Sequence, residues 1–361
     1  MIQSRILELC GWLRYYPSGD NCQPFLFSIV NDTLHISSDA TRMIGLLNQT
    51  GNASRISLGS VIFLAKIVGP TIGIKVHQVI SDPQKITATI VFQSCDTEPN
   101  SLIAEIKYRR THRKVFSPNL NPQDIDLLAQ NMSSQSILLK SFTPTEQTIT
   151  TLMKSESSLL RSFEFLEELF FWLRDQSRYV DDGMLWEDVG LSQVQYSLLN
   201  YLIHHQKTIF RTFVNMGGVS FLSKRVIHKQ IKSSQRFVAA LVHEKNLRDP
   251  NLYIEVGETM MRLWLNLSQK GFGAQPLSFS SILPIEIEVG QFQSQSINHQ
   301  ATINFSKELA QQLNLNNDQR MAWLFRVGTH HQSLTAIRRA TNEIAIIEDS
   351  AENKNEKLVS V

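Results

Sequence analysis

Cysteine is scarce in this chain of 361 residues, which contains only Cys10, Cys22 and Cys95. Three is an odd number and the spacing matches no set of metal ligands, so the pattern argues against a disulfide framework and against a metal site. Unpaired thiols are typical of a reducing compartment. We therefore expect a cytoplasmic protein without a bound metal.

An excess of one charge and long apolar runs are also missing. The chain has 35 Lys and Arg against 33 Asp and Glu, a formal net charge of +2, so bulk charge gives no reason to expect a nucleic acid or a membrane surface as partner. No apolar run approaches the roughly 20 residues that span a bilayer. The N-terminus lacks the core and cleavage site of a signal peptide. We expect a small-molecule substrate, with no nucleic acid and no membrane as partner.

A polar turn at residues 17–25 is the first feature that the sequence does contain. Apolar residues recur every three or four positions before it, which predicts a helix, and two apolar runs after it predict a strand hairpin. The turn reads PSGDNCQPF and presents the hydroxyl of Ser18 and the side-chain amides of Asn21 and Gln23 at one point. Ordinary turn chemistry explains these residue types, and so does a ligand site.

The remaining patterns divide the chain into two α+β units. A nearly all-apolar helix at 56–67 and strands at 72–80 and 86–92 complete the first unit, which ends in a polar stretch. The second unit contains strands at 237–242 and 322–327, a helix at 253–270 and a loop at 272–279. We expect helices packed on a mainly antiparallel sheet in each unit. The predicted divisions are a module at 1–97, a module at 98–349, an aromatic-rich insertion at 175–221 and a disordered tail at 350–361.

A basic string opens the second unit, where residues 109–116 read RRTHRKVF. Guanidinium groups bind phosphate oxygens through two parallel hydrogen bonds, and the Thr111 hydroxyl adds a neutral donor. A solvated run of charge explains the string equally well. The same two interpretations apply to Arg338 and Arg339 near the C-terminus.

Two of these segments resemble signatures of the FMN-dependent nitroreductase superfamily. The turn is similar to Pro-Ser-x-x-Asn-x-Gln-Pro-Trp, with Phe25 in place of Trp and Cys22 at a variable position. The basic string is similar to Arg-Arg-Ser-x-Arg-x-Phe, with Thr111 in place of Ser and one extra residue before Phe116. In that family the first signature contacts the flavin and the second holds its phosphate. The resemblance therefore implies FMN-binding roles for Ser18, Asn21, Gln23, Arg109, Thr111 and Arg113.

The resemblance extends to the later segments. In relatives, main-chain amides of a glycine loop after the central helix face the flavin N5 edge, and a C-terminal Lys or Arg contacts the phosphate. Here a glycine can supply such a loop without steric cost. The implied residues are Gly273, Pro276, Leu277, Arg338 and Arg339.

The order of the two signatures implies an internal pseudo-dimer. Enzymes of this family are homodimers in which each flavin takes one signature from each subunit. This chain carries one of each in successive halves. The first half lacks an Arg-Arg-Ser string, and the second half has QNMSSQSI at 130–137 where the turn signature is expected. The chain thus resembles the tandem, Acg-like clade, acting as a monomeric pseudo-dimer or associating further into a homodimer, with one intact flavin site and one degenerate site.

The resemblance implies an FMN-dependent oxidoreductase. Hydride would be accepted at flavin N5 from NAD(P)H or a substrate and passed to an unidentified acceptor, and no protein nucleophile or general acid is demanded. The alternative is an Acg-like protein that stores FMN without turnover, with the insertion at 175–221 as a lid over the flavin. A redox role for Cys22 is a lesser alternative, because no second cysteine lies near it in the sequence.

Overall fold

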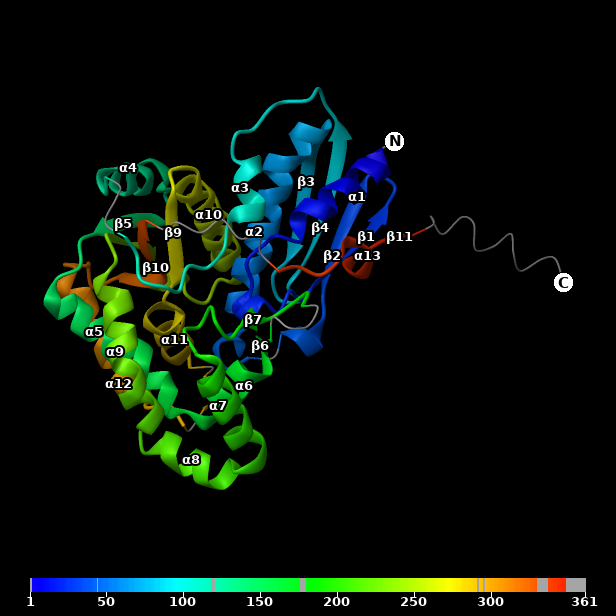
Figure 1. The fold of residues 1–361 in the computed structure, drawn as a ribbon. Helices are drawn as coiled ribbons and strands as arrows, with labels where there is room; N and C mark the ends of the chain where they lie inside the picture. The colour runs from blue at the N-terminus through cyan, green and yellow to red at the C-terminus, as the bar shows by residue number, and fades with distance from the viewer. Residues whose placement is uncertain are drawn as a thin grey trace.

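The computed structural model describes residues 2–43, 45–117, 121–175, 180–290, 292–294, 296–329 and 337–348. The expected tail at 350–361 lies outside these ranges. Helices and strands build two lobes that meet at a pair of long helices (Figure 1). The helices are α1 (Ile2–Leu13), α2 (Asn52–Val68), α3 (Ile103–Tyr108), α4 (Gln123–Met132), α5 (Glu146–Ser158), α6 (Phe163–Phe171), α7 (Gln193–His205), α8 (Lys207–Asn215), α9 (Gly218–Lys232), α10 (Pro250–Gln269), α11 (Ser278–Glu288), α12 (His299–Gln312) and α13 (Thr341–Ile344). The strands are β1 (Phe25–Val30), β2 (Thr33–Ser38), β3 (Ile74–Asp82), β4 (Thr87–Ser94), β5 (Leu138–Phe142), β6 (Leu173–Arg174), β7 (Met184–Leu185), β8 (Arg236–His243), β9 (Phe272–Pro276), β10 (Gln319–Thr329) and β11 (Ala345–Ile347).

The first lobe is a sheet with the strand order β11-β1-β2-β4-β3. Alternate residues of β1 are buried, as expected for a strand with one face against the core. Helix α1 packs its apolar stripe into the same core. The predicted hairpin is present, and Asn31 adopts the left-handed backbone (φ 54°) that a tight turn requires.

The second lobe is an antiparallel sheet with the strand order β5-β8-β10-β9. Strand β8 is buried along most of its length, because helices cover both faces of this sheet. Helices α4 and α10 contribute to the apolar cluster on one face, and α5, α9 and α12 contribute to the cluster on the other. The expected α+β class is therefore observed in both lobes.

Helices α2 and α10 cross at the centre of the molecule, and the contact is reciprocal. A Cβ added to Gly59 would lie 2.0 Å from the carbonyl oxygen of Ile254, and one added to Gly257 would lie 2.0 Å from that of Ile56. Ile254, from the second lobe, belongs to the core of the first, whereas Ile56, from the first lobe, belongs to the core of the second. Each helix thus completes the core of the opposite lobe.

Helix α2 is long and apolar enough by composition to cross a membrane. The stretch Asn52–Ile72 has a mean hydropathy of 1.4, but 67% of its most apolar window is buried inside the protein. It packs against α10 and α1, so its composition is that of a core helix.

The C-terminal segment returns to the first lobe. Strand β11 pairs in parallel with β1, with Ala345 opposite Phe27 and Ile347 opposite Ile29. The sequence-based division placed these residues in the module 98–349. Their pairing with the first sheet is a long-range contact that local periodicity does not encode.

Replacing Gly59 with Ala should destabilise the fold by about 1–3 kcal/mol or more, because the new methyl group meets backbone that cannot move aside. Thermal or urea unfolding monitored by circular dichroism measures the change. Gly11→Ala in α1 is the matched control, since its Cβ would meet only the Oγ1 of Thr341 at 3.7 Å. We expect the control to be neutral or stabilising. Equal stability of the two variants would contradict the close crossing.

Candidate functional site

A cavity of about 340 Å³ lies where the predicted site segments meet. This volume falls within the range of small-molecule sites, roughly 300–1,000 Å³. Its walls come from the 17–24 turn, the basic string, α2, α10, the end of β9 and the segments around α6 and α9. The predicted residues that line it are Ser18, Thr111, Arg113, Pro276 and Leu277.

The turn that contributes Ser18 has an unusual backbone. Asp20, Asn21 and Gln23 have φ angles of 46°, 56° and 48°. Left-handed backbone costs a non-glycine residue about 1–3 kcal/mol, and such residues cluster at functional sites. The Oγ of Ser18 accepts a hydrogen bond from the backbone N–H of Gln23 at 2.9 Å, which holds the turn closed. Asp20, in the same turn, is one of the residues that line the cavity.

Asn21 and Gln23 lie behind the lining and bind distant backbone. The Nδ2 of Asn21 donates to the carbonyl oxygens of Gly183 (3.0 Å) and Ile337 (3.2 Å). The Oε1 of Gln23 accepts from the backbone N–H of Arg339 at 3.0 Å, and its Nε2 donates to the carbonyl of Asp181 at 2.9 Å. In this structure the two amides therefore join the C-terminal segment and the 181–183 loop to the turn.

The basic string runs beside β9. Thr111 forms a parallel bridge with Ala274, and the backbone N–H of His112 donates to the Ala274 carbonyl at 3.0 Å. This pairing brings the string next to the predicted glycine segment. The interpretation of 272–279 as a loop is wrong, because 272–276 form strand β9, in which Gly273 pairs with Gly328 of β10. Gly273 therefore lies in the sheet and does not line the cavity.

Positive charge gathers at this end of the cavity, where Asp188 pairs with Arg110 and not with Arg109 or Arg113. Arg113 lines the cavity, and its Nη2 contacts the Sδ of Met184, a weak acceptor, at 2.9 Å. Arg109 is 3% exposed and its guanidinium lies 4.4 Å from the ring centroid of Trp264, another lining residue. Within the described part of the chain, neither Arg109 nor Arg113 makes an ion pair within 4.0 Å.

Arg338 joins the same cluster from the C-terminal segment. Its Nη1 donates to the Oδ1 of Asn21 at 2.7 Å, and both it and Arg109 donate to the carbonyl of Tyr15. Among the residues that the structure describes, the buried Nε atoms of Arg109 and Arg338 have no hydrogen-bond partner, and neither does Nη1 of Arg339. A bound anion could accept hydrogen bonds from these unused donors.

Burial makes it energetically unfavourable for these arginines to carry their positive charge. It lowers the pKa of Arg338 to about 10 and the pKa of Arg109 well below its ordinary value. Repulsion from Arg338 lowers the pKa of Arg109 further, and repulsion from Arg14 and Arg110 lowers that of Arg338. Burial likewise lowers the pKa of Arg113, while Asp20 and Asp188 act to raise it. A bound anion would offset this penalty, since opposite charge favours the protonated guanidinium.

Three carboxyl groups also face the cavity, and sequence reasoning missed their role. Burial raises the pKa of Glu156 and of Glu168 to about 7, and it raises the pKa of Asp20. One oxygen of Glu156 accepts from the N–H (3.0 Å) and the Oγ (2.7 Å) of Ser280. A carboxyl group that keeps its proton near neutral pH is a hydrogen-bond donor toward a ligand.

Arg326 is a second missed residue, and it positions the basic string. It is 0% exposed, and its guanidinium donates to the carbonyls of His112 (3.0 Å) and Lys114 (2.8 Å) as well as to Gln275. Its sequence signal was available, because it is the one charge within the apolar run MAWLFRV of β10. A lone charge in a buried strand must be paired.

Only the first part of the insertion at 175–221 lies against the cavity. Met184 and Val189 line the cavity, together with Trp172 just before the insertion, and Arg42 ties the loop down through an ion pair with Asp182. Residues 193–222, which include α7 and α8, contribute nothing to the lining. Figure 1 shows these helices projecting away from the two sheets.

Cys22 lines the cavity as a thiol. Burial raises the pKa of Cys22 to about 12, and the nearby Asp20 acts in the same direction. A raised pKa disfavours the reactive thiolate. All three cysteines are free, and the described residues contain no cluster of His, Cys, Asp and Glu able to hold a metal ion.

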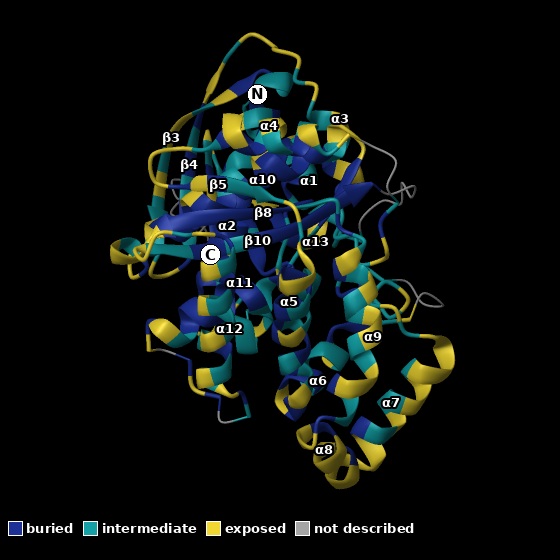
Figure 2. Ribbon diagram, turned by 90° about the vertical axis from the view of Figure 1, so that its left-hand side faces the viewer, coloured by how far each residue is buried: buried dark blue, intermediate teal, exposed yellow. Residues whose placement is uncertain are grey.

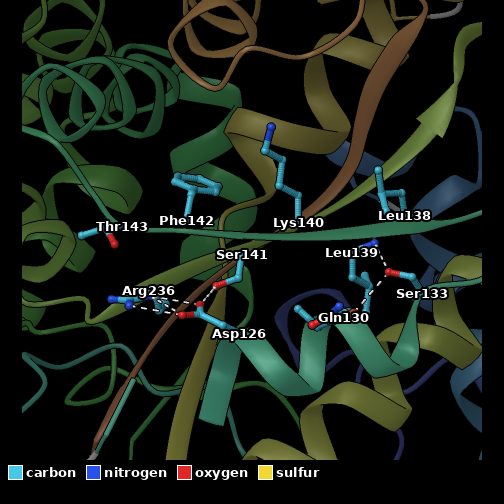
Figure 3. A pocket seen from close by; sticks show the side chains of 11 residues that line it. Asp126, Gln130, Ser133, Leu138, Leu139, Lys140, Ser141, Phe142, Thr143 and Arg236 are labelled. Carbon is cyan, nitrogen blue, oxygen red and sulfur yellow. Dashed lines mark hydrogen bonds and ion pairs between the residues drawn. The ribbon is translucent and has the colours of Figure 1, made fainter. Parts of the chain in front are cut away.

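A second hollow lies at the segment where the degenerate site was expected. It is a groove of about 580 Å³ along α4 and β5, and Gln130 and Ser133 line it (Figure 3). Asp126 accepts from Arg236 at 3.0 Å and from the Ser141 hydroxyl at 2.6 Å, and Lys140 donates to the carbonyl oxygen of Leu313 at 2.7 Å. The groove thus has an arginine paired with a carboxylate, unlike the buried Arg109 and Arg113 near the first cavity.

The cavity and its surroundings define a class of site: an aromatic-lined chamber between two lobes, with unpaired buried guanidinium groups at one end. Such a site suits a ligand that joins an apolar ring to an anionic group. No family model and no curated protein matches the chain.

Several solved structures have a similar arrangement of elements. A nitroreductase-like family protein from Bacillus cereus is 11% identical, with 70% of this chain and 98% of that chain covered and a TM-score of 0.36. FMN-bound nitroreductases from Desulfitobacterium hafniense DCB-2 (9% identity, 70% and 100% covered, TM-score 0.38) and Bacteroides fragilis NCTC 9343 (10% identity, 67% and 95% covered, TM-score 0.34) are also similar. Because the identities and TM-scores are low, this likeness assigns no family.

Replacing Glu156 with Gln should flatten the pH dependence of stability. The native state holds this proton up to about pH 7, while an unfolded Glu releases it near 4.5. The contribution of Glu156 to the free energy of unfolding is therefore fully present below about pH 4.5 and is lost as the pH rises toward 7. Glu156→Gln keeps the acceptor for Ser280 and removes this loss, so its Tm should exceed that of wild type at pH 8 and match it near pH 4.5.

Thermal unfolding across this pH range checks the expectation. The exposed Glu98→Gln serves as control and should retain the wild-type dependence. Parallel curves for wild type and Glu156→Gln would show that Glu156 is not held protonated.

Proposed function

We propose that this chain binds FMN and acts as an FMN-dependent oxidoreductase. The observation that carries the proposal is the cluster of buried Arg109, Arg113 and Arg338 beside an aromatic-lined cavity, because none of the three makes an ion pair within the described part of the chain and two of them have unused donors. A phosphate is a dianionic group that fits this cluster. The two sequence signatures that resemble flavin-binding strings both contribute residues to this cavity.

The residues present fit the cofactor at two ends. Arg113 and Thr111 in the lining, with Arg109 and Arg338 immediately behind them, would hold the phosphate. The apolar wall formed by Met260, Trp264 and other lining side chains would accommodate the ring, and Pro276 and Leu277 border the same space. Asn21 and Gln23 would act from behind by fixing the turn and the C-terminal segment.

When bound, FMN supplies hydride transfer, which no amino-acid side chain provides. The chain's own residues orient it and limit access of water. The α6 segment and the 181–184 loop close one side of the cavity, held by the ion pair of Arg42 with Asp182. The carboxyl group of Glu156 holds a proton on the cavity wall near neutral pH. NAD(P)H as electron donor, and the nature of the acceptor, belong to the proposal as the sequence resemblance implies them.

Replacing Arg113 with Ala should weaken FMN binding about 10- to 100-fold, because a charge-assisted hydrogen bond to phosphate contributes about 1.5–3 kcal/mol. Purified wild-type protein should show the two visible bands of oxidised flavin, directly or after incubation with FMN. Fluorescence titration with FMN measures the affinities. The exposed Arg248→Ala is the matched control and should bind as wild type does.

Two outcomes contradict parts of the proposal. If wild type shows no flavin bands after incubation with FMN, or if Arg113→Ala binds as tightly as wild type, the cofactor site is wrong. If flavin binds but anaerobic NADPH and NADH both leave its bands unchanged, turnover with nicotinamides is wrong, and the sequestering alternative replaces it.

We also propose that the two lobes of one chain correspond to the two subunits of a dimer. The reciprocal crossing of α2 and α10, with each helix entering the core of the opposite lobe, supports this internal pseudo-dimer. The expected species in solution is then a monomer of 41.2 kDa. Light scattering after size exclusion measures the mass, and a stable dimer at micromolar concentration would refute the monomeric assignment.

A further inference from the structure

Helices α7 and α8, together with the N-terminal end of α9, form a projecting tip with a large apolar surface. Figure 2 shows much of α7 and α8 exposed, and Figure 1 places them beyond both sheets. The tip residues include Met216 at 81% exposure, Val194 at 77% and Phe221 at 74%. Isolated exposed apolar residues are ordinary, but a group of this size marks an interaction surface. The other exposed large apolar residues of the tip are Leu198, Tyr201, Ile209, Phe213, Leu222 and Val226.

The exposed residues follow helical spacing. In α8 and the residue that follows it, Ile209, Phe213 and Met216 are exposed at intervals of four and three, whereas Phe210 and Val214 are buried in the small core under the tip. The helix therefore has one apolar stripe that packs and another that faces solvent. In α7, the exposed Val194, Leu198 and Tyr201 repeat this spacing.

Charge is segregated at the same place. No Asp or Glu occurs between residues 189 and 243, a stretch that contains seven Lys and Arg. Lys207 and Lys232 pair with Glu167 and Glu146 of neighbouring elements. The remaining cations of the three helices form no ion pair among the described residues; they are Arg211, Lys224, Arg225 and Lys229.

We propose that this tip docks on the surface of an anionic lipid membrane. Large apolar side chains that project from helices and are accompanied by Lys and Arg are the pattern of interfacial membrane binding, in which the apolar residues enter the headgroup region and the cations meet anionic lipid. The tip projects from the two sheets (Figure 1), so its apolar side chains can reach into a fluid surface. A symmetric contact with a second copy would place the same unpaired cations against each other. This inference is independent of the flavin site.

Vesicle flotation of the full-length protein tests the docking. We expect binding to phosphatidylcholine vesicles that contain about 30% phosphatidylglycerol, and little binding to phosphatidylcholine alone. The double variant Phe221→Ser/Leu222→Ser should bind at least about tenfold more weakly, because it removes apolar area that enters the interface. Arg225→Gln should bind about fivefold more weakly, since it removes one cation near the surface.

The control is Ile80→Ser, which changes an apolar side chain that is 55% exposed on β3 in the other lobe. It should bind as wild type does. All of these positions are exposed, so an unchanged Tm will show that the variants fold. Failure of wild type to float with anionic vesicles would overturn the proposal. Equal weakening of vesicle binding by Ile80→Ser would also overturn it. A wild-type protein that self-associates, and that Phe221→Ser/Leu222→Ser makes monomeric, would overturn it as well, because a second copy would then be the occupant of the tip.

Discussion

The contact between the backbones of α2 and α10 sets the spacing of the two lobes. Because Gly59 and Gly257 carry no side chains, the helices approach until the Cβ positions would overlap the facing carbonyls. The cavity is bounded on one side by these helices and on the other by segments from both lobes. A wider crossing would separate the turn after α1 from the string beside β9. The geometry of the site therefore depends on two glycines that do not touch it.

Electrostatics gives the cavity its chemical character. Cations gather at one end with unused donors, while carboxyl groups elsewhere on the wall keep their protons near neutral pH because burial disfavours their charge. A wall with protonated carboxyl groups does not cancel the positive end. The cavity can thus hold an anionic group and donate hydrogen bonds to a ring at the same time.

Local patterns predicted much of the fold, and distant contacts explain the rest. The helix at 253–270 is present because it has an apolar period, and the strand at 237–242 because it is a short continuous apolar run. Strand β9 differs from the predicted loop, because Gly273 and Pro276 are typical of loops and the pairing that makes the segment a strand comes from β10. No sequence pattern near the 17–25 turn predicts that the side-chain amides of Asn21 and Gln23 bind the segment around Ile337 and Arg339, more than 300 positions later. The balanced net charge likewise hid the segregation of cations at the tip.

The pairing of β11 with β1 has a consequence for biosynthesis. Most of the first lobe emerges from the ribosome early. Strand β11, which completes the edge of its sheet, is made only after the second lobe. Until then β1 presents unpaired backbone groups, which is the situation that favours wrong pairing between nascent chains. Maturation of the first lobe must therefore follow synthesis of the second lobe, and any ligand that needs residues 337–348 in place can bind only after that segment has been made.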